Sequence, residues 1–192
     1  MLWDELLDLC ELTYEKLESD EWRDRFTNDL NEMFVRRYVG YELRNGRIER
    51  VGTQAQDEMI GRARALLRDD DLRGPDEQFQ KAIAFLNRRP EPDLENAVKE
   101  AVSAVEGVAR ILLDDHSLVF SRALARLKSE KDVHPTLVAL LDKLYAYRGD
   151  AKGVGHALTG AKEVRLEDVE LALAVSASAI VFLARLFDRA MD

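Results

Sequence analysis

The segment Leu144-Tyr-Ala-Tyr-Arg-Gly-Asp-Ala-Lys-Gly-Val-Gly-His-Ala-Leu158 lies between two strongly helical stretches and organises the chain around it. Glycine is expected to break or bend a helical pattern, and this segment contains three, Gly149, Gly153 and Gly155. The same short break contains four charged or ionisable side chains, Arg148, Asp150, Lys152 and His156. We therefore predict a glycine-rich bend that presents polar groups between two helices.

The residue types in this bend suit a ligand that carries phosphate. Arg148 offers a fixed fork of donors to phosphate oxygens, and His156 can exchange a proton near neutral pH. Backbone N–H groups in a glycine-rich turn can add a concave anion site. The alternative is a helix cap and turn in which both side chains are merely solvated.

Two longer segments carry a family resemblance. One is His134-Pro-Thr-Leu-Val-Ala-Leu-Leu-Asp-Lys-Leu-Tyr-Ala-Tyr-Arg-Gly-Asp-Ala-Lys-Gly-Val-Gly-His-Ala-Leu158, and the other is Pro92-Asp-Leu-Glu-Asn-Ala-Val-Lys-Glu-Ala-Val-Ser-Ala-Val-Glu106. Together they resemble the HEPN superfamily, in particular the branch found as the C-terminal domain of abortive-infection-like bacterial proteins. The similarity extends from Pro92 to the C-terminus.

The resemblance implies an antiparallel helical bundle that dimerises. Active members of the family are metal-independent ribonucleases, many of them in phage defence or toxin–antitoxin pairs. Their signature is an Arg followed by a His at a shorter spacing than the seven residues that separate Arg148 from His156 here. A polar residue often follows the Arg directly, whereas here Gly149 follows it and Asp150 comes one place later.

The resemblance also assigns roles to individual residues. Arg148, His156 and Asp150 are the expected catalytic residues, and no metal or other cofactor is expected. Basic side chains near the bend are expected to attract RNA, namely Lys152, Lys162 and Arg165. Supporting roles fall to Glu106 and Tyr147. Glu106 also has a purely structural interpretation, because it precedes Arg110 by four residues, the favourable order for a helical ion pair.

Composition limits the possible partners. The chain has 192 residues and a net charge of −9, which argues against a general nucleic-acid coat but leaves room for a local basic site. Cys10 is the only cysteine, so no intrachain disulfide can form. The first residues are acidic and lack the basic start of a secretory signal, so we expect a cytoplasmic protein without a membrane segment.

The first half is expected to be a helical region of residues 1–90 with one β-hairpin. Apolar residues recur at helical spacing over residues 2–17, 21–38 and 53–68, and a further helix follows Pro75. Trp22, Phe26, Leu30, Met33 and Phe34 form one expected core face. Asn45-Gly46 within residues 41–51 predicts a hairpin with a type I′ turn.

The second half, residues 91–192, is expected to be the HEPN-like bundle. Pro90 and Pro92 mark the boundary. Helices are predicted over 93–115, from 118 to 127, from Pro135 to the bend, and over 166–189. The apolar run 171–186 is predicted to be a buried bundle helix, since it is short for a membrane span. The predicted fold class is mainly α with one hairpin.

Three functions remain open on these observations. The first is a dimeric HEPN-type endoribonuclease that uses the ribose 2′-OH as nucleophile. The second is a catalytically silent HEPN module that binds RNA or a protein partner such as an antitoxin. The third is a small structural helical protein in which the bend is only a turn. The stretched spacing between Arg148 and His156 favours the second over an unqualified first, and the charged groups of the bend count against the third.

Overall fold

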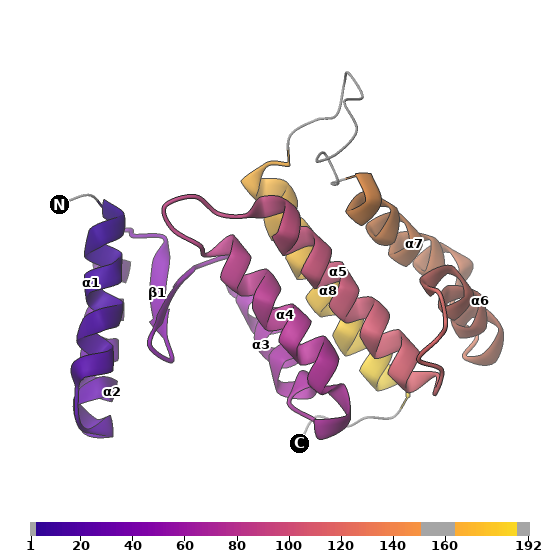
Figure 1. Cartoon of the computed structure of the whole chain (residues 1–192), viewed down its shortest axis with the longest axis horizontal. Helices are drawn as coiled ribbons and strands as arrows, with labels where there is room; N and C mark the ends of the chain where they lie inside the picture. Colours follow the sequence, from indigo (N-terminus) through magenta and orange to yellow (C-terminus); the bar gives the residue numbers. More distant parts are fainter. Residues whose placement is uncertain (1–2, 151–163, 188–192) are drawn as a thin grey trace. The chain divides into compact units, whose positions relative to one another are not determined.

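The computed structural model describes residues 3–150 and 164–187 and has the predicted class, mainly α with one antiparallel hairpin (Figure 1). The elements in chain order are α1 (Trp3–Lys16), α2 (Asp20–Arg36), β1 (Tyr41–Arg44), β2 (Arg47–Arg50), α3 (Gln54–Leu67), the 3₁₀ turn η1 (Asp70–Leu72), α4 (Arg73–Leu86), α5 (Leu94–Leu112), α6 (Phe120–Glu130), α7 (Pro135–Asp150) and α8 (Leu166–Leu186). Each predicted helix is present, with ends that differ by a few residues.

The chain forms two compact units. Unit 1 contains residues 1–54 and 87–92, and unit 2 contains residues 55–86 and 93–192. This division differs from the boundary expected near residue 90. The reason is that α3 and α4 share a continuous apolar core with α5 and the later helices, whereas the proline-containing segment 87–92 is bonded to the hairpin of unit 1.

Unit 1 is built around the predicted hairpin. Asn45 and Gly46 both have positive φ, 49° and 81°, as a type I′ turn requires. Leu43 pairs with Ile48, and both side chains are buried against α1 and α2. A lone hairpin is marginal in water, so its stability depends on this helical cover.

Side chains from α1, α2 and the segment 87–92 bond to outward backbone groups of the hairpin. The Asn31 carboxamide accepts from the Leu43 N–H at 2.7 Å and donates to the Leu43 carbonyl at 3.1 Å. On the other strand the Glu11 carboxylate accepts from the Ile48 N–H at 2.7 Å, and Arg89 donates to the Ile48 carbonyl at 3.5 Å. Both open edges are thereby closed within the unit, which removes the usual template for strand addition.

The prediction that one face of α2 lies in the core is wrong for two of its five residues. Leu30 and Phe34 are buried, but Trp22 is 57% exposed and Met33 is 48% exposed. These two lie along one side of the helix, whereas the short hairpin covers only the side that carries Leu30 and Phe34. The unit has too little structure to bury the whole aromatic stripe.

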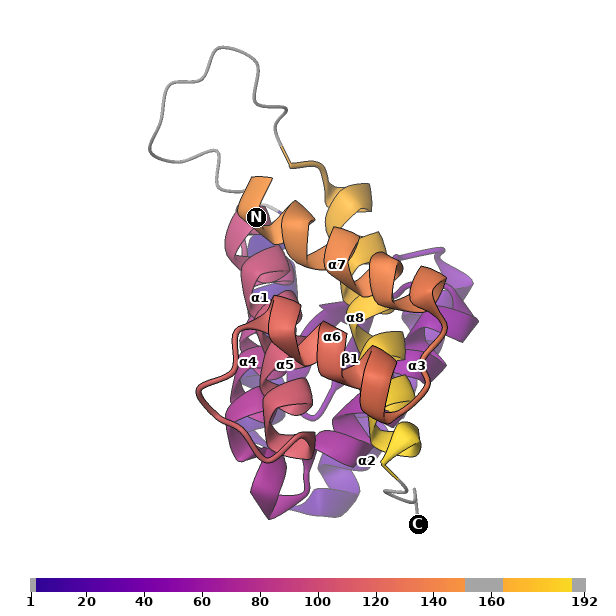
Figure 2. The same ribbon diagram turned by 90° about the vertical axis from the view of Figure 1, so that its right-hand side faces the viewer.

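Unit 2 has α5 at its centre. α5 packs against α4 on one side and against α8 on another, and α3 contributes Ala63, Leu66 and Leu67 to the same apolar core. Figure 2 shows α6 and α7 together in front of α5 and α8. The predicted packing of α5 with both α7 and α8 is confirmed. Because α5 has a neighbour on most of its circumference, its buried residues include one charged group, Glu106.

Within the described residues α8 is the one helix long and apolar enough to cross a membrane, with 21 residues and a mean hydropathy of 1.9. Length alone therefore does not separate it from a membrane span, contrary to the sequence-based argument. More than half of its most apolar window is buried against other helices of unit 2, as in the central helix of a bundle.

A close approach between α4 and α5 depends on Gly107. A Cβ atom at this position would lie 2.9 Å from Cγ of Pro75, inside van der Waals contact. Pro75 is itself buried in the first turn of α4. Glycine thus allows the two helices to meet where the candidate site begins.

We predict that Gly107→Ala lowers the free energy of unfolding by about 1–3 kcal/mol, the usual cost of overpacking. Urea unfolding followed by circular dichroism measures this. The matched control is Gly61→Ala, in the interior of α3, where nothing lies within 4 Å of the new Cβ. That change should stabilise by roughly 0.5–1 kcal/mol through helix propensity. Equal effects of the two changes would contradict the close-approach argument.

Candidate functional site

Arg148 lies on the last turn of α7, within the helix. The helix continues through Gly149 to Asp150, so the predicted break does not begin at Gly149. Nothing lies close to the missing Cβ of Gly149, and an isolated glycine is tolerated in a helix that tertiary contacts hold in place. Arg148 consequently takes its orientation from helical geometry.

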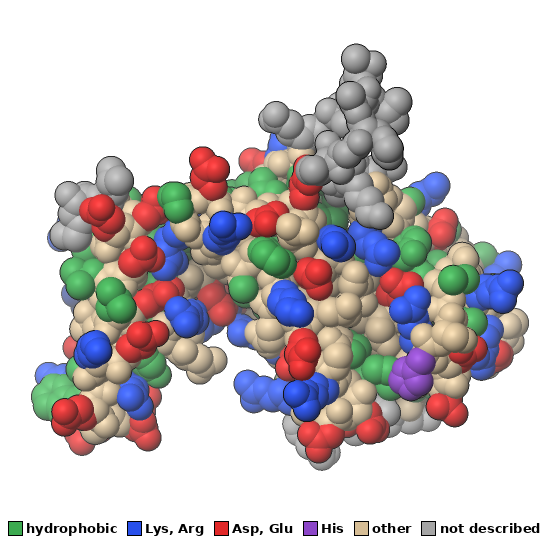
Figure 3. Space-filling model, in the orientation of Figure 1, with side chains coloured by type: hydrophobic (Ala, Val, Ile, Leu, Met, Phe, Trp, Pro, Cys, Tyr) green, Lys and Arg blue, Asp and Glu red, His purple; other side chains and the backbone are tan. Residues whose placement is uncertain are grey.

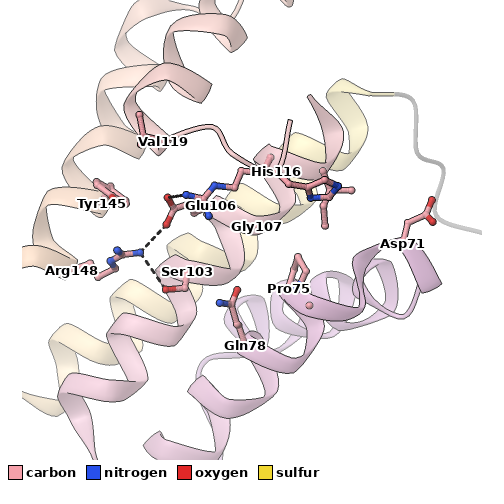
Figure 4. Close-up of a pocket in the computed structure, with 13 residues that line it drawn as sticks. Asp71, Pro75, Gln78, Ser103, Glu106, Gly107, His116, Val119, Tyr145 and Arg148 are labelled. Carbon is pink, nitrogen blue, oxygen red and sulfur yellow. Dashed lines mark hydrogen bonds and ion pairs between the residues drawn. The ribbon is translucent and has the colours of Figure 1, made fainter. Parts of the chain in front are cut away.

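The Arg148 guanidinium is directed at α5 (Figure 4). Its Nη1 donates to the Glu106 carboxylate (Oε2) at 2.9 Å and to the Ser103 hydroxyl (Oγ) at 3.2 Å. The guanidinium carbon also lies 4.7 Å from the ring centroid of Tyr145, one turn earlier on the same helix. These contacts fix the guanidinium plane, since a cation over an aromatic face is attracted by the ring quadrupole.

Glu106 is shared between two arginines. Its second oxygen accepts from Nη2 of Arg110 at 2.8 Å, and Nε of Arg110 donates to the Leu118 carbonyl at 2.6 Å. The Glu106 side chain is only 9% exposed, and removing either arginine would leave a buried group without one of its partners. One carboxylate between two guanidinium groups leaves a net charge of one positive unit in the cluster.

Part of the Arg148 fork has no partner among the residues that the structure describes. Both of its hydrogen bonds use Nη1, and neither Nε nor Nη2 donates to any residue in the described part of the chain. A guanidinium held at one nitrogen while the others remain free can bind an anion through two parallel N–H groups. Among the described residues, the site therefore combines a fixed guanidinium orientation with donors that bond to no side chain or carbonyl.

A cavity of about 750 Å³ adjoins this cluster and lies entirely within unit 2. Its polar lining includes Gln78, Ser103, Glu106, Arg110, His116, Arg148 and Asp71. Figure 4 shows Arg148 and Asp71 at opposite ends, with Gln78 and His116 between them. Pro75 and Tyr145 contribute apolar surface. Such a concave site with a few converging polar groups is typical of small-ligand binding.

The structure brings together two of the predicted site residues, Arg148 and Glu106. The remaining described ones lie elsewhere. Arg165 pairs with Asp168 at the start of α8, with 3.0 Å between Nη2 and Oδ1. Burial raises the pKa of the Tyr147 hydroxyl and the Asp168 carboxylate acts in the same direction, so Tyr147 belongs to that second cluster.

Four of the predicted residues fall where no side chain is described. Lys152, His156 and Lys162 lie outside the described residues, and Asp150 is described only as the last residue of α7.

Sequence reasoning missed several residues of this site. The spacing of Ser103, Glu106 and Arg110 on one face of α5 was a usable signal, and the predicted pair of Glu106 with Arg110 is confirmed. No sequence signal indicated Gln78 or His116, because Gln78 comes from α4 and His116 from the connection between α5 and α6. Only the packing of unit 2 brings them to the cavity.

The electrostatic setting of unit 2 is mixed. Figure 3 shows Lys and Arg side chains interspersed with Asp and Glu over the face that it presents. Within residues 3–150 and 164–187, no three His, Cys, Asp or Glu side chains gather closely enough to hold a metal ion. The chemistry visible in this site is therefore that of the arginine–carboxylate cluster and the cavity beside it.

Neither a protein-family model, nor a curated protein, nor a solved structure matches the chain.

We predict a strong energetic coupling between Arg148 and Glu106. In a double-mutant cycle with Arg148→Met and Glu106→Gln, the coupling free energy of unfolding should be about 1–3 kcal/mol, as for contacting groups in one network. The exposed pair Arg73–Glu77 on α4 is a matched control and should give about 0.3–0.5 kcal/mol. Similar couplings in both cycles would show that burial adds nothing to the site pair.

Proposed function

We propose that the chain is a metal-independent endoribonuclease of HEPN type. The observation that carries the proposal is the open fork of Arg148, fixed by Glu106 and Ser103 at the edge of a cavity. A fixed, always charged fork that has unused donors suits a scissile phosphate. The family resemblance from Pro92 onward supplies the reaction class.

The reaction would begin at the ribose 2′-OH. Its oxygen attacks phosphorus, the bond to the leaving 5′-oxygen breaks, and a 2′,3′-cyclic phosphate remains. His156 would accept the 2′ proton or supply a proton to the leaving oxygen, because an imidazole titrates near pH 7. Arg148 would hold the phosphate and offset its growing negative charge. Glu106 acts as a positioning residue, and Asp150 would orient one of the two catalytic groups.

The proposal includes a cytoplasmic homodimer, in phage defence or a toxin–antitoxin pair. Leu137 and Leu140 on α7 are 45% and 53% exposed, although they lie one turn apart on the helix that carries Arg148. In a dimer whose two-fold axis lies beside α7, the α7 helix of the second copy would cover these leucines. The same arrangement would bring a second Arg148 and His156 near the first. Lys152, Lys162 and Arg165 would guide RNA to the paired sites.

A silent HEPN module that binds RNA or a protein partner without cutting is the second candidate. The contact of Arg148 with Glu106 favours it, because the same ion pair has a structural use as the tie between α7 and α5. The two candidates predict different behaviour toward RNA, so one assay separates them.

We expect the purified protein to cleave single-stranded RNA in EDTA and to leave 2′,3′-cyclic phosphate ends. Arg148→Lys should lower the cleavage rate about a hundredfold or more, since a lysine cannot reproduce the bidentate fork. His156→Ala should do the same. Arg148→Ala is less informative because it also removes the tie to Glu106.

The control for this assay is Arg73→Lys on the exposed face of α4, which should keep full activity. If wild type and His156→Ala are equally inert, the silent module is the better reading. Cleavage that requires Mg²⁺ would contradict the mechanism.

We also predict a dimer at tens of micromolar by light scattering. Leu140→Lys should produce monomers, because burying an unpaired ammonium in an apolar interface is costly. Val35→Lys, at a residue of α2 that is 75% exposed, is the matched control and should remain dimeric. A wild type that is monomeric throughout would rule out the paired site.

A further inference from the structure

The cavity beside Arg148 has a gradient of charge along its length. At one end, Arg148, Arg110 and Glu106 together carry one net positive charge. At the other end lies the carboxylate of Asp71, on η1 (Figure 4). One phosphodiester carries one negative charge, which matches the first end. A second phosphate at the other end would meet Asp71 and be repelled.

The wall between these ends offers neutral recognition groups. The Gln78 carboxamide is half-buried, and its oxygen lies 3.5 Å from the position of a Cβ on Gly107. It makes no hydrogen bond to any residue within 3–150 or 164–187. The imidazole of His116, across the cavity, is likewise without a hydrogen bond among these residues. Free donors and acceptors beside a single anion site are what a nucleobase needs.

We propose that this cavity is a base-reading subsite, which takes one unpaired nucleobase next to the phosphate held by Arg148. The inference rests on the proposed function and adds its substrate class, single-stranded RNA with adenine in the cavity. A carboxamide can donate to and accept from the edge of adenine at the same time, so Gln78 is the specificity-determining residue. His116 borders the same base and adds a second hydrogen bond. Pro75 and Ile111 supply apolar surface for the ring.

The depth of the subsite follows from the same contact that joins α4 to α5. Gly107 has no side chain, so the first turns of α4 approach α5 closely and Gln78 reaches the cavity wall. The cavity opens to solvent between residues of η1, α4, α5 and α7, so a base that projects from an unpaired strand can enter it. Single-stranded RNA should bind better than duplex RNA, because the base edges of a duplex are already paired with one another.

The test uses short homopolymers of 2′-O-methyl adenosine, cytidine and uridine, which lack the nucleophilic hydroxyl and cannot be cut by this chemistry. Titration of the full chain by fluorescence anisotropy should show tightest binding to the adenosine oligomer. Gln78→Ala should weaken that binding about 5- to 100-fold and abolish the preference among bases, as the loss of a bidentate base contact does. His116→Ala should weaken it by a smaller factor.

The matched control is Gln80→Ala, two residues further along α4, where the side chain bonds to Arg64 and Asp76 and does not line the cavity. It should bind as wild type does. Equal binding of all three oligomers by wild type, or binding by Gln78→Ala within about twofold of Gln80→Ala, would overturn the subsite.

Cleavage of the corresponding unmodified RNAs, measured in parallel, separates the two proposals. Cleavage that ignores Gln78→Ala would leave the nuclease standing and remove the subsite. Base-selective binding that depends on Gln78, without any cleavage, would keep the subsite and remove the nuclease.

Discussion

The ion pair between Arg148 and Glu106 is the constraint on which the site depends. The two side chains are separated by forty-two residues in the chain and are joined at 2.9 Å. Glu106 is almost fully buried, and a buried carboxylate remains charged only if its surroundings supply compensating donors. Arg110 and Arg148 both do so, from different helices. The need to pair one buried charge thus fixes the end of α7 against α5.

The helix α5 can hold this charge because its faces have different tasks. One face packs on α4, another on α8, and the third carries Ser103, Glu106 and Arg110 at helical spacing. If α5 were apolar on every side, α7 would pack on a purely hydrophobic surface that does not specify its position. The polar strip instead specifies where α7 lies, because an arginine that misses its carboxylate leaves a buried charge unpaired.

Local signals predicted much of the fold. Asn45-Gly46 predicted the hairpin because the turn chemistry is decided by two adjacent residues. The pair of Glu106 with Arg110 could be read from one helical turn.

The errors share a different cause. The exposure of Trp22 depends on how little structure covers α2, and the passage of α7 through Gly149 depends on contacts made with α5. Gln78 and His116 reach one cavity only through the packing of three helices and a connection, which no short window of sequence contains.

Under the proposed function, Arg148 would have two tasks that draw on different nitrogens. Nη1 donates to Glu106 and Ser103, while Nε and Nη2 donate to no residue within 3–150 or 164–187. A lysine in its place would have one ammonium to divide between the structural contact and a ligand, so an arginine is the residue that serves both. The same division would let a chain of net charge −9 hold a phosphate. Its attraction for RNA would come from a local excess of one charge beside Glu106 rather than from the field of the whole protein, and each such phosphate contact contributes only about one unit to the salt dependence of binding. Under this proposal, recognition would depend more on the shape and hydrogen bonds of the cavity than on long-range charge.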